Sequence, residues 1–239
     1  MRSTICLPTY NELENLEAMV KALERVLREG DRVLVVDDAS PDGTGELADR
    51  LAAEHPFVDV LHRAAKEGLG PAYIAGFRRA LGDGAELVLE MDCDFSHDPA
   101  DVPRLIAAAE GGADLVLGSR YVPGGAIPNW GTVRRFVSLT GNLYAQVMLQ
   151  SRLRDLTGGF KCFRARVLEE IDLDAIGTKG YAFQIETTYR VLRAGFRVVE
   201  VPISFSDREF GHSKMSKGIV AEAIWKVPLL RVRARSGRL

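Results

Sequence analysis

Two carboxylates lie two residues apart, directly after an apolar run. Residues 87–89 are apolar, and Asp92 and Asp94 follow within the stretch MDCDFSHDP. Side chains two apart in a strand point to the same side, so both carboxylates are expected to aim at one spot. Hard cations such as Mg²⁺ or Mn²⁺ take oxygen ligands and bridge a few carboxylates to substrate phosphates. The pattern favours a divalent-metal site at Asp92 and Asp94, with Cys93 turned into the core.

An ordinary structural role is the alternative for these two aspartates. Asp also caps helices and stabilises turns, and a helix is expected to begin at Pro99. A second Asp-x-Asp pair, Asp172 and Asp174, has the same spacing but follows a predicted helix instead of a buried strand. We interpret Asp172 and Asp174 as solvated surface residues.

Other motifs, present or absent, limit the kinds of binding site that the sequence can form. The acids of VVDDAS either cap a helix or, at a strand end, accept hydrogen bonds from a ribose or a base. The four histidines show no HxxxH or HxH spacing, so we expect no histidine-based metal site. Neither GxGxxG nor GxxxxGK[ST] occurs, and nothing therefore points to a dinucleotide fold or a P-loop nucleotide hydrolase.

Basic residues are grouped where phosphate binding would need them. Arg120 follows a predicted strand, Arg134 and Arg135 open a helix, and Arg208 and Lys214 lie in the polar stretch SDREFGHSKMS. A solvated charge is the commonest role of such residues. Several fixed donors beside a metal would instead suit phosphate groups, which arginine binds through two parallel hydrogen bonds.

The elements that must position these residues alternate along the first half of the chain. Strands are expected at residues 3–7, 32–36, 57–61, 86–91 and 113–119, with helices over residues 11–28 and from Gly45, Pro71 and Pro99. This alternation is typical of an α/β fold with a mostly parallel central sheet flanked by helices. Ligands of such sheets bind at the carboxyl ends of the strands, where PTYNE, DDAS, the Asp92/Asp94 pair and GSRY are found.

The second half is less regular. We expect a helix near residues 134–149, a turn at LTGGF, a helix after Tyr181, a strand over residues 197–205 and a last helix from about Ser216. No repeat or clear linker divides the chain.

Composition limits the class of protein. The chain has 239 residues, 46% of them hydrophobic, and a formal net charge of -2, which argues against a general nucleic-acid binder. Cys6, Cys93 and Cys162 are far apart in apolar surroundings, as expected of core residues in a reducing cytosol. We expect no secretion signal and no membrane span, because no stretch approaches about 18 uncharged apolar residues.

Seven motifs together resemble those of one enzyme family. These are PTYNE, VVDDASPDGT, MDCDFSHDP, GSRYVPGG, TGGFKCF, GYAFQIE and VPISFSDREFGHSKMS. Over residues 3–220 the chain is similar to the polyprenol (dolichol) phosphate mannose synthases, which are GT-A glycosyltransferases of family 2. The resemblance implies that mannose passes from GDP-mannose to a polyprenyl phosphate with inversion and with Mg²⁺ or Mn²⁺.

The resemblance also implies roles for individual residues. The nucleoside would be contacted by Pro8, Tyr10, Glu12, Val36 and Asp38. The region of the diphosphate and metal would be formed by Asp92, Cys93, Asp94 and Ser96, with Asp92 and Asp94 as metal ligands. The donor diphosphate would also be held by Arg120, Arg208 and Lys214. The acceptor phosphate would be held by Arg120, Arg134, Ser138 and Arg208. Ser96 stands where some members carry a metal-binding glutamine, so the third metal ligand stays open.

The residue types agree with this chemistry. A sugar hydroxyl acceptor would need a base, whereas a lipid phosphate is already anionic and needs only alignment. The catalytic set is then Asp94 with the five residues that bind phosphate. Two alternatives stay open: a related family 2 enzyme with another donor such as UDP-glucose, and, from another class, a phospho-receiver signalling module, which VLVVDDAS resembles.

The end of the chain is expected to differ from the rest. We assign residues 1–215 to the catalytic domain and residues 216–239 to an amphipathic basic helix or tail. Ile219, Ile224, Trp225, Val227 and Leu230 would place it at a membrane interface, on the cytoplasmic face. The alternative is a terminal helix packed on the domain with a frayed basic end. Some family members carry further membrane spans, which leaves room here for a membrane-anchoring partner.

Overall fold

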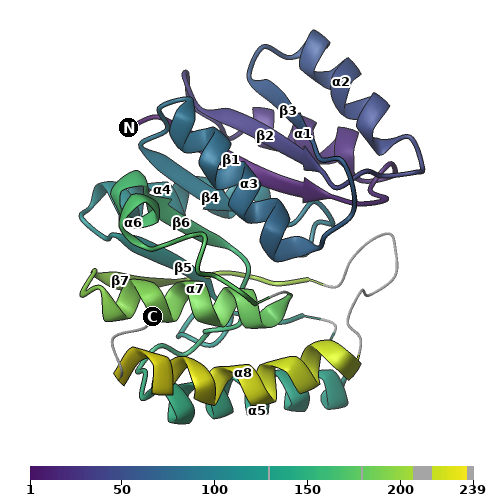
Figure 1. The fold of residues 1–239 in the computed structure, drawn as a ribbon. Coiled ribbons are helices and arrows are strands. Elements are labelled where there is room, and N and C mark those ends of the chain that lie inside the picture. The colour runs from purple at the N-terminus through teal and green to yellow at the C-terminus, as the bar shows by residue number, and fades with distance from the viewer. Residues whose placement is uncertain (129, 179, 207–216, 236–239) are drawn as a thin grey trace.

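The computed structural model of the protein describes residues 1–128, 130–178, 180–206 and 217–235 (Figure 1). Its centre is a seven-stranded sheet in the order β3-β2-β1-β4-β6-β5-β7. The strands are β1 (Ser3–Thr9), β2 (Arg32–Asp37), β3 (Val58–His62), β4 (Leu87–Glu90), β5 (Leu115–Ser119), β6 (Lys161–Arg164) and β7 (Val198–Pro202). All neighbours are parallel except β6, which runs antiparallel to β4 and β5. The mostly parallel sheet expected from the sequence is confirmed.

The helices cover both faces of this sheet. They are α1 (Leu16–Glu24), α2 (Thr44–Glu54), α3 (Leu69–Gly82), α4 (Val102–Glu110), α5 (Thr132–Leu149), α6 (Ala165–Glu170), α7 (Tyr181–Arg193) and α8 (Lys217–Arg235), with a 3₁₀ turn at Pro99–Asp101. The buried residues of α1 are Leu16, Met19, Val20 and Leu23, a spacing that lines up one face of a helix. One apolar core lies under α1, α2 and α4, and a second lies under α3, α6 and α7.

Strand β6 is the one element that the sequence pattern did not predict. It follows the turn expected at LTGGF and inserts between β4 and β5, with Lys161 opposite Glu90 in the register with β4. Because β6 runs antiparallel, its first residue lies at the sheet edge where the parallel strands end. Residues 157–161 therefore reach the same edge as Asp92 and Asp94.

Helices α5 and α8 lie side by side below α7 in Figure 1. Val227 and Leu230 of α8 are buried in a third apolar cluster with Ala145, Leu149 and Tyr189. The expectation that Val227 and Leu230 lie at a membrane interface is therefore wrong, because both pack against the body of the protein. Ile224 and Trp225 are exposed, as expected. Among the helices of the described ranges, none combines the length and apolarity that a bilayer crossing requires.

Gly76 lets α3 approach the sheet closely. A Cβ atom at this position would lie 3.1 Å from Cγ2 of Val36 and 3.2 Å from Sγ of Cys6. We expect Gly76→Val to lower the free energy of unfolding by about 1 to 3 kcal/mol through overpacking. Gly82, in the last turn of the same helix, would meet nothing within 4 Å and is the matched control. Urea denaturation of both variants measures the effect, and an equal midpoint for Gly76→Val and Gly82→Val would contradict it.

Candidate active site

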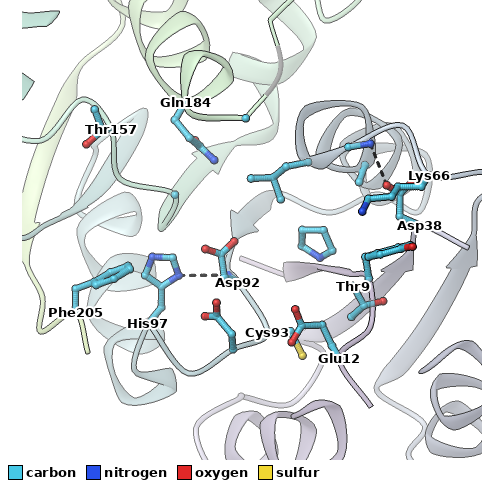
Figure 2. A pocket seen from close by; sticks show the side chains of 18 of the residues that line it. Thr9, Glu12, Asp38, Lys66, Asp92, Cys93, His97, Thr157, Gln184 and Phe205 are labelled. Carbon is cyan, nitrogen blue, oxygen red and sulfur yellow. Dashed lines mark hydrogen bonds between the residues drawn. The ribbon is translucent and has the colours of Figure 1, made fainter. Parts of the chain in front are cut away.

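A cavity of about 360 Å³ opens at the carboxyl ends of β1, β2 and β4 (Figure 2). It brings together most of the residues that the sequence singled out. Its lining includes Pro8, Tyr10, Glu12, Asp38, Asp92, Cys93, Asp94 and Arg120. It also includes residues without an earlier assignment, among them Thr9, Lys66, His97, Thr157, Gly159, Gln184 and Phe205.

Two aspartates at the end of β2 organise one end of the cavity. Buried Asp37 accepts hydrogen bonds from Oγ1 of Thr9 at 3.2 Å and from the backbone N–H of Ser40 at 3.1 Å. Asp38 accepts from the N–H groups of Glu67 and Gly68, at 3.2 and 3.0 Å, and pairs with Arg63. Asp38 therefore fixes the segment that leads into α3. Neither the composition nor the residue spacing of the sequence predicted this role.

Lys66 lies on this fixed segment and was missed by the sequence analysis. Its Nζ stands 3.6 Å from the ring centroid of Tyr10, a cation–π geometry. Both side chains line the cavity. This end of the cavity thus offers an aromatic face, a cation and the Asp38 carboxylate, which are groups that suit a nucleoside and its first phosphate.

The Asp92/Asp94 pair lies in a loop rather than on a strand. Strand β4 ends at Glu90, and Phe95 has a positive φ of 58°. The strand alternation that predicted a shared direction therefore does not apply. Hydrogen bonds hold the loop instead: Tyr73 donates to Asp92 at 3.2 Å, and the Ser96 N–H donates to Asp94 at 3.1 Å. Both carboxylates nevertheless line the cavity.

His97 forms the wall beside this loop. It is buried, stacks on Phe160 at 5.0 Å between ring centroids and meets Phe205 edge-on at 5.1 Å. Its Nδ1 accepts a hydrogen bond of 3.3 Å from the Asp92 N–H, which requires Nδ1 to be unprotonated. His97 is thus a buried core residue that orients Asp92.

The residues at the loop suit a divalent metal in their chemistry. No group of three or more His, Cys, Asp or Glu side chains within the described residues is arranged to hold a metal ion by itself. Asp92 and Asp94 offer carboxylate oxygens, and Oγ of Ser96 is buried with no hydrogen-bond partner in the described part of the chain. An all-oxygen set of this kind fits Mg²⁺ or Mn²⁺ whose remaining ligands come from substrate phosphates.

Arg120 is fixed by a buried ion pair with Asp155. Its Nε and Nη2 donate to the two Asp155 carboxylate oxygens at 2.7 Å each, and Nη2 also donates to Oγ1 of Thr157 at 2.8 Å. Burial alone would raise the pKa of Asp155, but the Arg120 charge and these hydrogen bonds hold it below its ordinary value. Arg120 therefore presents a guanidinium of fixed orientation to the cavity.

Arg134 and Ser138 stand one turn apart on α5 and do not line the cavity. The guanidinium carbon of Arg134 lies 4.2 Å from the ring centroid of Trp130. Ser138 accepts a 2.7 Å hydrogen bond from the hydroxyl of Tyr121, the residue after Arg120. The loop after β5 thus connects these two residues to Arg120.

Several other predicted site residues lie elsewhere. The side chain of Val36 is fully buried in the core beside α3 and does not line the cavity. Arg208 and Lys214 lie outside the described residues. Asp172 and Asp174 are exposed, as expected, and Asp174 pairs with Arg78 at the surface.

Below the cavity, the chain buries a second ion pair. Lys161 and Glu90 are fully buried, with 3.8 Å between Nζ and Oε2. Burial raises the pKa of Glu90 to about 7, although the Lys161 charge opposes this rise. Lys161 also donates a 2.9 Å hydrogen bond to the backbone oxygen of Gln184. These residues come from the motifs TGGFKCF and GYAFQIE, and the spacing of the two motifs in the sequence did not predict this contact.

Curated relatives match this chain over nearly its whole length. It is 53% identical over 235 residues to an undecaprenyl-phosphate mannosyltransferase of Micrococcus luteus, covering 98% of this chain and 96% of the relative. It is 48% identical over 238 residues to a polyprenol monophosphomannose synthase of Mycolicibacterium smegmatis, covering 99% of this chain and 89% of the relative.

Solved structures resemble the fold at much lower identity. A glucosyl-3-phosphoglycerate synthase of Mycobacterium tuberculosis superposes with a TM-score of 0.64 at 18% identity, covering 98% of this chain and 79% of that one. A mannosyltransferase of Pyrobaculum calidifontis, in complex with GDP-Man and Mn²⁺, gives a TM-score of 0.60 at 18% identity, covering 98% and 73%. These likenesses establish the GT-A fold.

A family model supports the same assignment. The model described as glycosyl transferase family 2 matches residues 4–172, which include all of β1 except Ser3, the whole of β2 to β6 and the Asp92/Asp94 loop. The chain therefore belongs to glycosyl transferase family 2 and, within it, to the polyprenyl-phosphate mannose synthases.

Proposed function

We propose that the enzyme transfers mannose from GDP-mannose to a polyprenyl phosphate with inversion. The relative in Micrococcus luteus, at 53% identity over 98% of the chain, is the observation that carries this proposal. The arrangement of the cavity supports it. A nucleoside end at Tyr10, Asp38 and Lys66 is followed by two carboxylates and then by a fixed arginine.

The nucleotide-sugar donor would lie along the cavity, from the nucleoside end past the two carboxylates to Arg120. Tyr10 and Lys66 hold the nucleoside and its adjacent phosphate, with the Lys66 segment kept in place by Asp38. Asp92 and Asp94, with Ser96 beside them, would hold Mg²⁺ or Mn²⁺. A bound divalent cation supplies Lewis-acid neutralisation of charge on the leaving diphosphate. Tyr73 and His97 orient the Asp92 carboxylate and its backbone for this task.

The acceptor would approach from the side of α5. Its phosphate is already anionic, so the site needs cations that align it rather than a base that removes a proton. Arg120 faces the cavity, and Arg134 and Ser138 stand one helical turn apart beyond it. Arginines at this point also reduce the repulsion between an anionic acceptor and an anionic donor. Arg208 and Lys214 belong to the same proposed set.

A lipid acceptor also calls for contact with a membrane surface. Exposed apolar side chains gather on the two adjacent helices α5 and α8. On α5 they include Val133, Phe136, Leu143 and Val147, and on α8 Ile224, Trp225, Leu229 and Val232. We assign these eight residues as the lipid-facing surface, because α5 also carries Arg134 and Ser138. Cys6 and Cys162 are free thiols buried in the core, which supports a setting on the cytoplasmic face.

The first test concerns the carboxylate pair. Asp94→Asn keeps the shape of the side chain but removes its charge, so we expect transfer of radiolabelled mannose to fall about a hundredfold or more. EDTA should abolish transfer by the parent, and Mg²⁺ or Mn²⁺ should restore it. The surface variant Asp174→Asn is the matched control and should stay within about twofold. Full activity of Asp94→Asn, or of the parent in EDTA, would show that the pair serves only the loop.

The second test separates acceptor from donor. Charge-assisted hydrogen bonds contribute about 1.5 to 3 kcal/mol, so Arg134→Ala should lower kcat/KM for a short polyprenyl phosphate about tenfold to a hundredfold. Binding of GDP-mannose, measured by calorimetry, should not change. The neighbouring exposed residue provides the control variant Arg135→Ala. Equal activity of Arg134→Ala and the parent would remove Arg134 from the acceptor site.

The third test addresses the lipid-facing surface. Phe136 and Trp225 are 68% and 81% exposed, so the double variant Phe136→Glu/Trp225→Glu should fold normally. We expect it to bind anionic liposomes at least about tenfold more weakly in flotation assays, since two apolar side chains no longer enter the lipid. Leu13→Glu, at a 41% exposed apolar residue outside α5 and α8, is the control. Unchanged flotation of the double variant would exclude this surface.

A further inference from the structure

A buried lysine holds a glutamine in one orientation at the cavity wall. Nζ of Lys161 donates a 2.9 Å hydrogen bond to the backbone oxygen of Gln184 and a second one to its side-chain Oε1. An ammonium group can only donate, so Oε1 of Gln184 must face Lys161. The Nε2 amide group must then point the other way. Glu90, 3.8 Å from Nζ, provides the opposite charge that keeps the ammonium in this place.

The Nε2 group of Gln184 needs an acceptor. Gln184 is 2% exposed, and its Nε2 makes no hydrogen bond of normal geometry within the described residues. A weak interaction with the Glu90 carboxylate, which opposes the rise in the Glu90 pKa, can occupy only one of the two N–H groups of Nε2. A buried donor without a partner is costly, and a ligand oxygen would remove that cost. Gln184 lines the cavity, and Figure 2 shows its amide directed into it.

The position of Gln184 indicates which part of the ligand it meets. In Figure 2, Thr9, Asp38 and Lys66 lie at one end of the cavity, and Gln184 and Thr157 at the other, with Asp92 between them. A nucleotide sugar whose diphosphate lies at the carboxylates therefore places its hexose beside Gln184. The hydroxyl oxygens of a hexose are acceptors of the kind that Nε2 requires.

Gly159 provides the space for this contact. A Cβ atom at position 159 would lie 3.3 Å from Nε2 of Gln184 and 3.8 Å from Cε1 of His97. A side chain here would therefore crowd both the amide and the adjacent wall. One short segment thus has two effects on Gln184: Gly159 leaves room for its amide group, and Lys161 fixes the orientation of that group.

We propose that Gln184 determines specificity for the donor sugar by donating a hydrogen bond from Nε2 to one hexose hydroxyl, with Lys161 as its positioning residue. The proposal rests on the proposed function, because it takes a nucleotide sugar as the ligand. It adds a contact to the sugar itself, whereas the groups considered above bind the nucleoside, the diphosphate and the acceptor.

Calorimetry with GDP and with GDP-mannose, both in Mg²⁺, tests the contact. Gln184→Met keeps the length of the side chain and removes the donor. We expect its affinity for GDP to stay within about twofold of the parent, and its affinity for GDP-mannose to fall about fivefold to a hundredfold. Gly159→Ala should show the same split. Gln146→Met, on α5 and outside the cavity lining, is the matched control.

Deoxy sugars identify the hydroxyl. The parent should bind one monodeoxy analogue of GDP-mannose more weakly than GDP-mannose, whereas Gln184→Met should bind the two alike. The double variant Glu90→Gln/Lys161→Met removes both buried charges together and should lose the preference for GDP-mannose over GDP in the same way. Loss of this preference alone would show that Lys161 positions Gln184, because a general loss of the fold would weaken the binding of both GDP and GDP-mannose.

Two results would overturn the inference: parent-like affinity of Gln184→Met for GDP-mannose, or an equal loss of affinity for GDP and GDP-mannose. Failure of the proposed function gives a different result, because the parent itself would then not bind GDP-mannose. If the parent selects UDP-glucose instead, the same comparison with UDP and UDP-glucose decides the role of Gln184.

Discussion

The buried pair of Arg120 and Asp155 connects the parts of the molecule that form the site. Arg120 follows β5 and Asp155 precedes β6, so the pair joins two loops at the same edge of the sheet. Removing one partner of such a pair is costly, about 3 to 5 kcal/mol, because the other charge stays buried. The rings of Tyr121, Trp130 and Phe205 surround the guanidinium, with their centroids 5.3 to 5.8 Å from its central carbon. The same cation thereby organises the cavity wall and the approach to α5.

The order of the strands explains why one edge can hold the whole donor. β1, β2 and β4 are adjacent and parallel, so the polar residues that follow them meet without any long-range loop. The antiparallel β6 adds the start of another strand to this edge, and with it Gly159 and Lys161. Loops at the ends of these four neighbouring strands thus surround the cavity, together with Lys66 after β3, Arg120 after β5 and Gln184 on α7.

Much of this arrangement could be predicted from the sequence, and the failures have physical reasons. The periodicity of apolar residues predicted the helices and the parallel strands, but β6 has only four residues and begins with a buried lysine, which no hydrophobic pattern indicates. Asp92 and Asp94 were assigned to the correct edge for a reason that does not hold, since loop hydrogen bonds rather than a strand direct them. The positions of Lys66 and Gln184 in the cavity depend on contacts between segments that are distant in the sequence, and these could not be predicted. Val227 and Leu230 could not be distinguished from exposed residues by sequence, because α8 has apolar side chains on both its packed and its exposed sides.

The packing of α8 has a consequence for the order in which the enzyme is completed during synthesis. α5 reaches its buried environment partly through α8, and the Tyr144 hydroxyl of α5 donates a 2.7 Å hydrogen bond to the backbone oxygen of Ile224. On the ribosome, α5 emerges long before α8. The buried face of α5 therefore stays without its contacts to α8 until α8 has been translated. The strands that form the nucleotide end can pair earlier, because their contacts lie within the first part of the chain. We therefore expect a nascent chain to pair β1, β2, β3 and β4 first, and to complete the packing of α5 only when the α8 segment has left the exit tunnel.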